Sequence, residues 1–348
     1  MTMTPRIATS CSRLSTALIG ATALFIGTAS PLAAQVLKSA DGDLLLPAGE
    51  GRSQVQLRDG RQIELPFTAK ARVSDFRAAE GRWFAAAVAR DAQGPRLELA
   101  TGDGDRVDSL AAPTVTDAPL LAQPIFVTDT ARVHALAWLE GGAHNRLAVH
   151  AARRVGNAWG TTEIISPAGL GTQTALTSTV LADGTWLLAW AAYDGTDDEI
   201  LWSRWSNGAW SAPQPVATDN RVPDITPTLR ATAEGALLAW SRYDGNDYRV
   251  NVAHFDGIGW TEPAIIGTRG STFPRFSDVS ELTLTYQHAD PRAWAVAELD
   301  ATGQVLRRAT VAEPRPDRPF LAVSGSTVTL EWAGVHAKTL SLALAAVE

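Results

Sequence analysis

Cysteine is almost absent from this sequence. Its 348 residues include one, Cys11, and that residue lies in an N-terminal segment that we predict to be removed. We therefore expect no disulfide, no catalytic thiol and no cysteine-ligated metal in the mature protein. Stability must come from apolar packing, for which the chain is well supplied, because 45% of it is hydrophobic and it contains 12 tryptophans.

Basic charge is also scarce, and lysine is the scarcest form of it. The lysines are Lys38, Lys70 and Lys338, so nearly every cation is an arginine, which can hold a carboxylate through two hydrogen bonds. Once Arg6 and Arg13 of the N-terminal segment are removed, 28 basic residues face 37 acidic ones, a net charge of −9. An acidic surface argues against nucleic acid or an anionic membrane as the main partner.

The first 34 residues lack acidic side chains entirely. Arg6 and Arg13 precede an apolar run from Leu14 to Ile26, and small residues and the segment 31–35 follow. This order predicts a secretory signal peptide over 1–34, cleaved near Ala34. The apolar run is shorter than the ~18 residues that span a bilayer, so we expect a periplasmic or secreted protein that does not span the membrane.

Several motifs that carry chemistry are missing. The sequence has no phosphate-binding glycine loop, no metal-type His/Cys spacing and no G-x-S-x-G elbow, and its six histidines are scattered. We therefore expect no cofactor. Calcium is the alternative, because aspartates recur in two loops. No segment shows a sustained 3.6-residue apolar period with caps, so helices should be few.

What the sequence does contain is a repeat. "LLAW" ends at Trp190 and at Trp240, and the similar "LAW", "LTY" and "LEW" end at Trp138, Tyr286 and Trp332, in steps of 46 to 52 residues. A period near 50 is typical of a β-propeller blade, a small four-stranded sheet that buries its faces only against its neighbours. Asp-Gly and Asn-Gly turns divide the units into hairpins. We expect these aromatic residues to be blade-to-blade core.

The repeat predicts an all-β propeller of six four-stranded blades. The expected blades lie near 72–112, 119–166, 172–217, 224–267, 273–312 and 318–348. The last unit is one strand short, so we expect Gln62–Phe67 to complete it and close the ring, because closure hides the last sheet edge. Residues 35–61 are then left as an N-terminal segment that caps or crosses one face.

Three turns repeat a second spacing. "ARRVGNAW", "SRWSNGAW" and "AHFDGIGW" each end on a tryptophan, at Trp159, Trp210 and Trp260. They resemble a degenerate Asp-box, S-x-D-x-G-x-T-W, of sialidases and related BNR-repeat propellers, although the box aspartate is absent from all three. The resemblance implies a sialidase-like six-bladed architecture, in which these tryptophans close hairpins and pack between blades.

The resemblance does not by itself imply sialidase activity. The family's arginine motif R-I-P belongs in the first blade, whereas "RVP" here begins at Arg221, in the middle of the chain. The family also needs a tyrosine with a glutamate partner, and none of the four tyrosines has one by spacing.

One face of the predicted propeller collects polar residues. The loops that join the second strand to the third, and those that join one blade to the next, share a face in this strand order. The candidate ligand-binding residues that they bring there are Tyr193, Asp194, Asp198, Arg221, Asp224, Arg242, Tyr243, Asp244, Asp247, Arg275 and His288.

Three interpretations of this face remain open. The aspartates can be turn formers that bond their own backbone, calcium ligands, or part of a glycan site built with arginine. We predict an exported binding module for a glycan or a protein surface, without catalysis. The alternatives are a sialidase-like glycoside hydrolase, which would place two carboxylates and an arginine in one deep central pocket, and a structural scaffold module of the cell envelope.

Overall fold

The computed structural model describes residues 37–38, 42–116, 118–142, 146–166, 171–193, 195–217, 221–277, 282–288, 292–313, 318–332 and 337–347. The chain divides into two units, Met1–Gln35 and Val36–Glu348. The predicted signal peptide falls in the first unit, outside the described residues.

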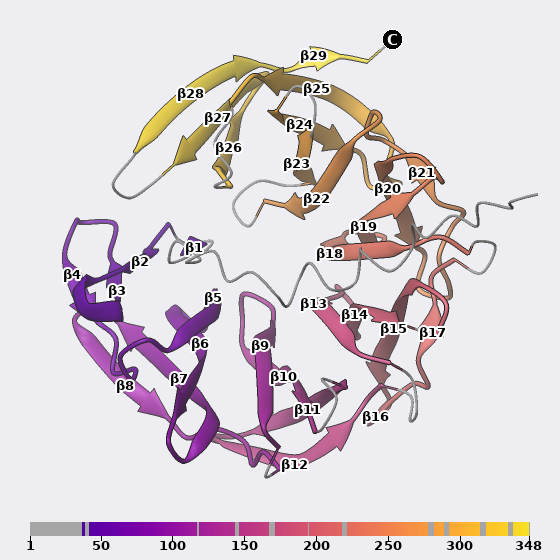
Figure 1. Ribbon diagram of the computed structural model, residues 1–348. Helices are drawn as coiled ribbons and strands as arrows, with labels where there is room; N and C mark the ends of the chain where they lie inside the picture. Colours follow the sequence, from indigo (N-terminus) through magenta and orange to yellow (C-terminus); the bar gives the residue numbers. More distant parts are fainter. Residues whose placement is uncertain are drawn as a thin grey trace, which may run out of the picture. The chain divides into compact units, whose positions relative to one another are not determined.

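The second unit is a β-propeller of seven blades, each an antiparallel sheet whose strands follow one another in chain order (Figure 1). The strands of the first three blades are β1 (Leu37–Lys38), β2 (Leu44–Pro47), β3 (Ser53–Gln56) and β4 (Gln62–Glu64); β5 (Arg72–Ala79), β6 (Arg82–Asp91), β7 (Gly94–Asp103) and β8 (Arg106–Leu110); and β9 (Leu120–Thr128), β10 (Val133–Gly141), β11 (Leu147–Val155) and β12 (Ala158–Ile164).

Blades four to seven continue the pattern with small variations. Their strands are β13 (Gln173–Val180), β14 (Trp186–Tyr193), β15 (Asp198–Ser206), β16 (Ala209–Trp210) and β17 (Gln214–Pro215); β18 (Asp224–Thr232), β19 (Gly235–Tyr243), β20 (Tyr248–Phe255) and β21 (Ala264–Ile265); β22 (Ser271–Phe276), β23 (Thr283–His288), β24 (Ala293–Leu299) and β25 (Val305–Val311); and β26 (Phe320–Ser324), β27 (Thr327–Trp332) and β28 (Lys338–Ala343). A last short strand, β29 (Ala345–Ala346), pairs with β25 of the sixth blade.

The predicted all-β propeller is therefore confirmed, but the count of six blades is wrong. The segment expected to complete the last blade forms β4 instead, which pairs with β3 through Gln54–Glu64 and Val55–Ile63. The first blade is thus made from the chain between Leu37 and Glu64. The expected scarcity of helices agrees with the described residues, whose single helical segment is the 3₁₀ turn Gly49–Gly51. None of the described residues forms a helix long and apolar enough to cross a membrane.

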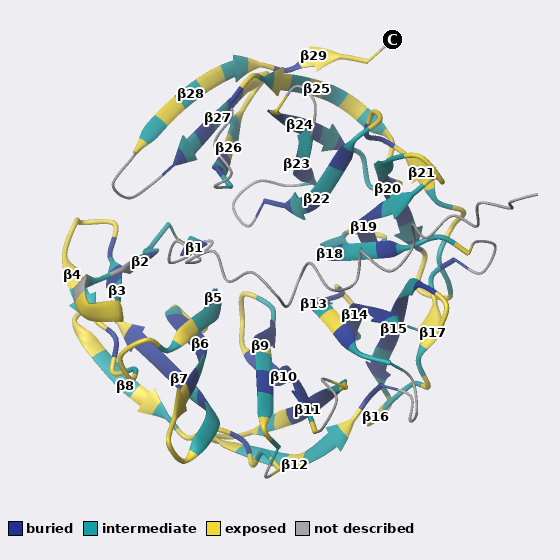
Figure 2. Ribbon diagram, viewed as in Figure 1, coloured by how far each residue is buried: buried dark blue, intermediate teal, exposed yellow. Residues whose placement is uncertain are grey.

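The core lies between blades, as expected for sheets that bury their faces on their neighbours. Trp138, Trp190 and Trp240 are fully buried on the second strand of their blades, and Tyr286 and Trp332 are 3% exposed. The prediction that this set is core is confirmed. Figure 2 shows the burial running along the middle strands, while the outer strands are partly buried and partly exposed.

The tryptophans of the degenerate boxes also pack rather than point away from the protein. Trp159, Trp210 and Trp260 are partly buried against three successive inter-blade clusters. Trp260 stands edge-on to Trp202, with ring centroids 5.9 Å apart. These side chains close their hairpins by apolar contact, as the sequence predicts.

Candidate functional site

Four of the predicted site residues gather at the junction of blades four and five. Tyr193 lies opposite Asp198 across β14 and β15, and Asp224 lies opposite Arg242 across β18 and β19. The Arg242 Nε atom is 3.8 Å from Asp224 Oδ1. Because Asp224 is 1% exposed, this aspartate and its arginine form part of the inter-blade core at that end rather than an open surface.

Tyr243 joins the same group through its neighbour Tyr248. The two rings are 5.3 Å apart. Burial raises the pKa of the Tyr248 phenol, and the nearby Asp198, Tyr243 and Asp224 raise it further. A phenol whose pKa is raised keeps its proton and can donate a hydrogen bond.

The aspartates of the following loop are held by the turn. Asp244 Oδ1 accepts the backbone N–H groups of Asn246 and Asp247, each at 2.9 Å, and its other oxygen lies 2.8 Å from Arg249 Nε. The two amides, and then Arg249, keep the pKa of Asp244 below its ordinary value. Asp247 lies 3.3 Å from Arg269. This is the bonding of a turn-forming aspartate.

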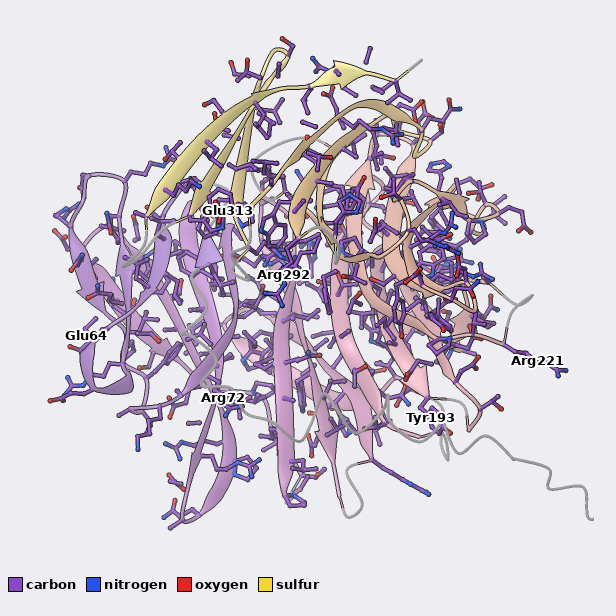
Figure 3. The ribbon with its side chains drawn as sticks, turned by 45° about the horizontal axis from the view of Figure 1, so that its top comes forward. Glu64, Arg72, Tyr193, Arg221, Arg292 and Glu313 are labelled. Atoms are coloured by element: carbon purple, nitrogen blue, oxygen red, sulfur yellow. The ribbon has the colours of Figure 1, made fainter. Side chains whose placement is uncertain are left out.

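The remaining candidates are dispersed. Arg221 is exposed and projects away from the ring (Figure 3). His288 Nδ1 lies 3.1 Å from Thr268 Oγ1 and 3.3 Å from Ser271 Oγ, and burial lowers the pKa of its imidazole. Asp194 lies outside the described residues. The described residues contain no group of three His, Cys, Asp or Glu side chains that could hold a metal ion.

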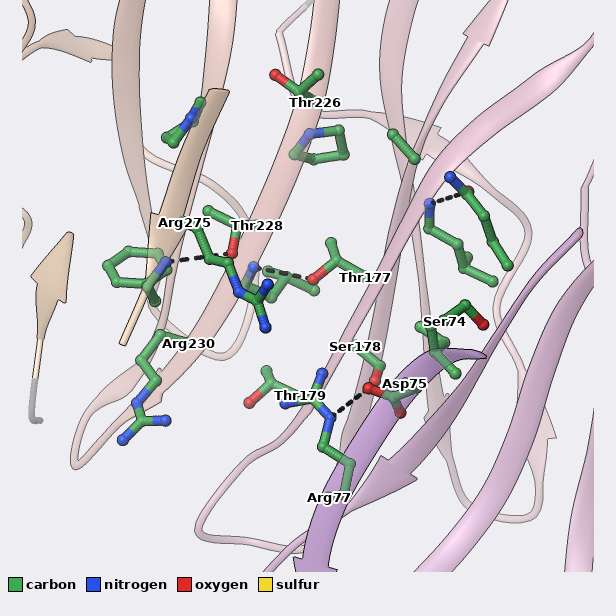
Figure 4. A pocket seen from close by; sticks show the side chains of 18 of the residues that line it. Ser74, Asp75, Arg77, Thr177, Ser178, Thr179, Thr226, Thr228, Arg230 and Arg275 are labelled. Atoms are coloured by element: carbon green, nitrogen blue, oxygen red, sulfur yellow. Dashed lines mark hydrogen bonds and ion pairs between the residues drawn. The ribbon is translucent and has the colours of Figure 1, made fainter. Parts of the chain in front are cut away.

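Among the described candidates, Arg275 alone lines the central channel. A cavity of about 390 Å³ lies there, lined by the innermost strands β5, β9, β13, β18 and β22 and by Arg318 ahead of β26 (Figure 4). Its polar lining includes Ser74, Thr177, Thr179, Thr226, Thr228 and Gln123. A cavity of this size suits a small polar ligand such as one or two sugar rings.

Side chains of one innermost strand satisfy the backbone of the next. An innermost strand presents an unpaired row of N–H and C=O groups to the channel, and buried groups of this kind need partners. The bonds that meet this need are Phe126 N–H to Asp75 (2.7 Å), Leu176 N–H to Gln123 (3.2 Å), Leu229 N–H to Thr177 (3.2 Å) and Ser178 hydroxyl to the Phe126 carbonyl (3.0 Å). The channel wall is thereby joined from blade to blade by polar side chains.

A β-bulge recurs at the same place in four consecutive innermost strands. In β9, β13, β18 and β22 the register slips, and one non-glycine residue there has a left-handed backbone. The four residues are Gln123 (φ 47°), Ala175 (φ 54°), Thr226 (φ 56°) and Phe273 (φ 55°). Left-handed non-glycine residues are strained, and strain of this kind clusters at ligand sites.

The bulge decides which side chains face the channel. In β13 the buried residues are Gln173 and then Leu176, Ser178 and Val180, so their spacing is three across the bulge and two after it. The extra residue thus reverses the inward–outward alternation of the strand. In β18 and β22 the same shift turns Thr228 and Arg275 toward the cavity, where both are half-buried.

Sequence reasoning missed most of this lining. It found Arg275 but not Arg77, Arg230, Arg318 or the threonines of β13 and β18. A signal was present: proline follows the left-handed residue in three of the four strands, at Pro124, Pro227 and Pro274. Proline within a strand marks a bulge or an edge, so three prolines at one position of the repeat point to the channel wall.

No family model matches the sequence, and no curated protein matches it. Solved structures share its fold. A structure from a study of two prolyl endopeptidases aligns with a TM-score of 0.56 at 13% identity, over 88% of this chain and 46% of that one. A puromycin-hydrolysing peptidase of Mycobacterium tuberculosis gives 0.54 at 13% identity, over 85% and 50%. Apo AztD from Citrobacter koseri gives 0.51 at 15% identity, over 89% and 83%.

The chain spans about half the length of the two peptidase structures. At these identities the likeness shows the β-propeller fold alone, which hosts many unrelated functions.

Proposed function

We propose that this protein is an exported, non-catalytic binding module that holds the end of a glycan in its central channel. The observation that supports the proposal is the polar wall of the channel. Four bulges lie at the same position of successive innermost strands, and hydroxyl, amide and guanidinium groups of these strands line one cavity. Hydroxyl and amide groups are the usual partners of sugar hydroxyls, and a cavity of about 390 Å³ admits a sugar but not a folded protein surface.

The carboxylates of the cavity favour binding over hydrolysis. Most glycoside hydrolases need two carboxylates facing each other across the scissile bond. Among the described lining residues the single carboxylate is Asp75, which is 6% exposed. Its oxygens lie 2.8 Å from Arg77 Nε and 2.7 Å from the backbone nitrogen of Phe126. Asp75 thus links two blades and is poorly placed to exchange protons with a substrate.

The test is a glycan array probed with the mature protein, together with a hydrolysis screen on reporter glycosides. Thr228→Trp should fill the cavity and abolish retention of any bound glycan. Thr161→Trp, on the exposed outer strand β12, is the matched control and should bind as the unaltered protein does. Retention that survives Thr228→Trp in a folded protein would place the site elsewhere, and release of a reporter sugar would favour the hydrolase.

A further inference from the structure

The outermost strand of each blade lies at the rim of the ring (Figure 1). An open sheet edge presents unpaired N–H and C=O groups, so natural sheets shorten it, bend it or place charge on it. The outer strands of blades one, four and five, β4, β16, β17 and β21, have two or three residues. β8 carries Arg106 and Asp108, and β12 carries Glu163 and a bulge. β25 carries Arg307 and Arg308 and is partly covered by β29.

The seventh blade lacks this protection. Its sheet has the order β26-β27-β28, so β28 is its outer strand. β28 pairs with β27 along its whole length without a bulge. From Thr339 to Ala343 it contains no charge, proline or glycine. Within the described part of the chain no strand pairs with its outer edge. The edge of β28 is therefore regular, uncharged and open.

The ladder between β27 and β28 shows which backbone groups of β28 face outward. The Leu344 N–H group donates to the Ser326 carbonyl at 2.7 Å, and the register continues from there without a shift to Trp332 opposite Lys338. In an antiparallel ladder, successive residues alternate between bonding to the partner strand and facing away from it. Every second residue, counted back from Leu344, therefore bonds to β27. The residues between them, which present their N–H and C=O groups to the open edge, are Thr339, Ser341 and Ala343.

This edge is complementary to itself. If two copies of β28 pair antiparallel with Ser341 opposite Ser341, then Thr339 of each copy lies opposite Ala343 of the other. Each of these residues directs its N–H and C=O groups at the opposite strand, so each opposed pair exchanges two hydrogen bonds. We propose that the protein forms a two-fold symmetric homodimer in which the two β28 strands pair in this register. The pairing occupies both open edges, so it closes at two copies.

The side chains of β28 favour a second copy over an unrelated strand. The same register sets Leu340 opposite Leu342 of the second copy, on the half-buried face of each strand. Opposed residues without backbone bonds bring their side chains closest together, and apolar cross-strand pairs stabilise a sheet.

Charge does not oppose this pairing. The single charged residue of β28 is Lys338, which forms an ion pair with Glu313 of the same copy. In the proposed register the two Lys338 residues lie about 20 Å apart, because a strand rises about 3.4 Å per residue. That separation exceeds the screening length of about 10 Å, so the two cations repel each other little.

The first experiment measures the mass of the mature protein by light scattering and sedimentation over a concentration series. We expect a dimer, and Ser341→Pro should weaken it about tenfold or more, because the central pair of hydrogen bonds is lost. The proline removes an outward N–H group and no bond to β27, so the blade should still fold. Ser341→Ala keeps the N–H group and is the matched control, which should dimerise as the unaltered protein does. Circular dichroism checks the folding of each variant.

The second experiment tests the register by cross-linking. Cys11, the one cysteine, lies in the predicted signal peptide, so an introduced thiol is unique in the mature chain. Ser341→Cys should give a covalent dimer under mild oxidation, because opposed residues of a hydrogen-bonded pair have Cα atoms about 5.5 Å apart, which a disulfide spans. Thr339→Cys is the matched control. Its two copies would lie about 14 Å apart, too far for a disulfide.

Three results would overturn the proposal. The unaltered protein could stay monomeric throughout the concentration series, or Ser341→Pro could leave a dimer at full strength. Thr339→Cys could also cross-link as readily as Ser341→Cys, which would refute the pairing register. None of these results bears on glycan binding, because β28 lies at the rim whereas the innermost strands line the cavity.

Discussion

Three tryptophans at the same position of successive blades differ in what their indole N–H meets. Trp138 Nε1 donates to Glu140 at 2.7 Å and Trp190 Nε1 to Gln173 at 2.6 Å. Trp240 Nε1 is buried and has no hydrogen-bond partner among the described residues. All three side chains are fully buried, so their apolar burial contributes similarly to stability. Their hydrogen bonding does not. The repeat thus places the indole ring at the same position in each blade, whereas the hydrogen bond of its N–H group differs from blade to blade.

This difference predicts unequal costs for one substitution. Trp190→Phe removes the donor to the amide oxygen of Gln173, a residue that is 1% exposed. Trp240→Phe removes a donor that is already unpaired. A buried polar group left without a partner costs about 1–3 kcal/mol. We expect Trp190→Phe to lower the free energy of unfolding by more than Trp240→Phe, by about that amount. Urea denaturation of both variants measures it, and equal losses would contradict the argument.

At the scale of the strand, the bulge is the element that makes the channel wall. A one-residue insertion reverses the alternation, and a left-handed residue absorbs the bend. Glycine would take that conformation at little cost, but the four positions hold Gln123, Ala175, Thr226 and Phe273. These positions keep their side chains at the expense of backbone strain. The Gln123 side chain, for example, accepts a hydrogen bond from the Leu176 N–H group of the next blade at 3.2 Å.

Relief of that strain is testable at Ala175, whose methyl group contributes little contact. Ala175→Gly should raise the free energy of unfolding by about 0.5–1 kcal/mol. A left-handed alanine costs about 1–2 kcal/mol, and the larger backbone entropy that glycine loses on folding offsets part of the gain from removing that cost. Ala158→Gly, at an exposed position of β12 without positive φ, should lower it by about 0.5–1 kcal/mol. Thermal and urea unfolding report both, and a destabilising Ala175→Gly would show that the strain is not relieved.

At the scale of the whole ring, the seam between the seventh and first blades differs from the others. Among the described residues six buried apolar clusters join the blades in sequence, from the first and second blades to the sixth and seventh. No such cluster joins the described parts of the seventh blade to the first. There Lys38 lies 3.2 Å from Glu331 and 5.7 Å from the centre of the Phe320 ring. Between the described residues, this seam is joined by an ion pair, a weaker contact than apolar burial.

Local opening should begin at this seam. We expect backbone amides of β2, β3, β27 and β28 to exchange hydrogen faster than those of β14 and β19, which flank a seam with a full apolar cluster. Lys38→Ala should speed exchange in the first and seventh blades and leave the fourth and fifth unchanged, while Lys70→Ala, at an exposed lysine, should change neither. Hydrogen-exchange mass spectrometry resolves the blades, and uniform exchange around the ring would refute the weak seam.

The sequence by itself determined the fold class and much of the core. A strand pair and its turn are local, and a repeat of about 50 residues that cannot bury both faces alone must stack on copies of itself. The repeat alone therefore sufficed to place Trp138, Trp190 and Trp240 in the core. The sequence also supplied the turn aspartates, whose bonding is local: Asp244 bonds amides two and three residues ahead of it.

The tertiary structure alone decided the number of blades and the channel wall. The first blade runs from Leu37 to Glu64, about half the length of the repeat. It contains none of the repeated tryptophans, so the periodicity of the sequence does not reveal it. The channel wall could not be predicted because of the bulges. A strict two-residue alternation along β18 or β22 assigns every residue after the bulge to the wrong face of the strand. Arg230 and Arg275 belong to strands that share no hydrogen-bonded ladder, and only the packing of the fifth blade against the sixth brings them to one cavity.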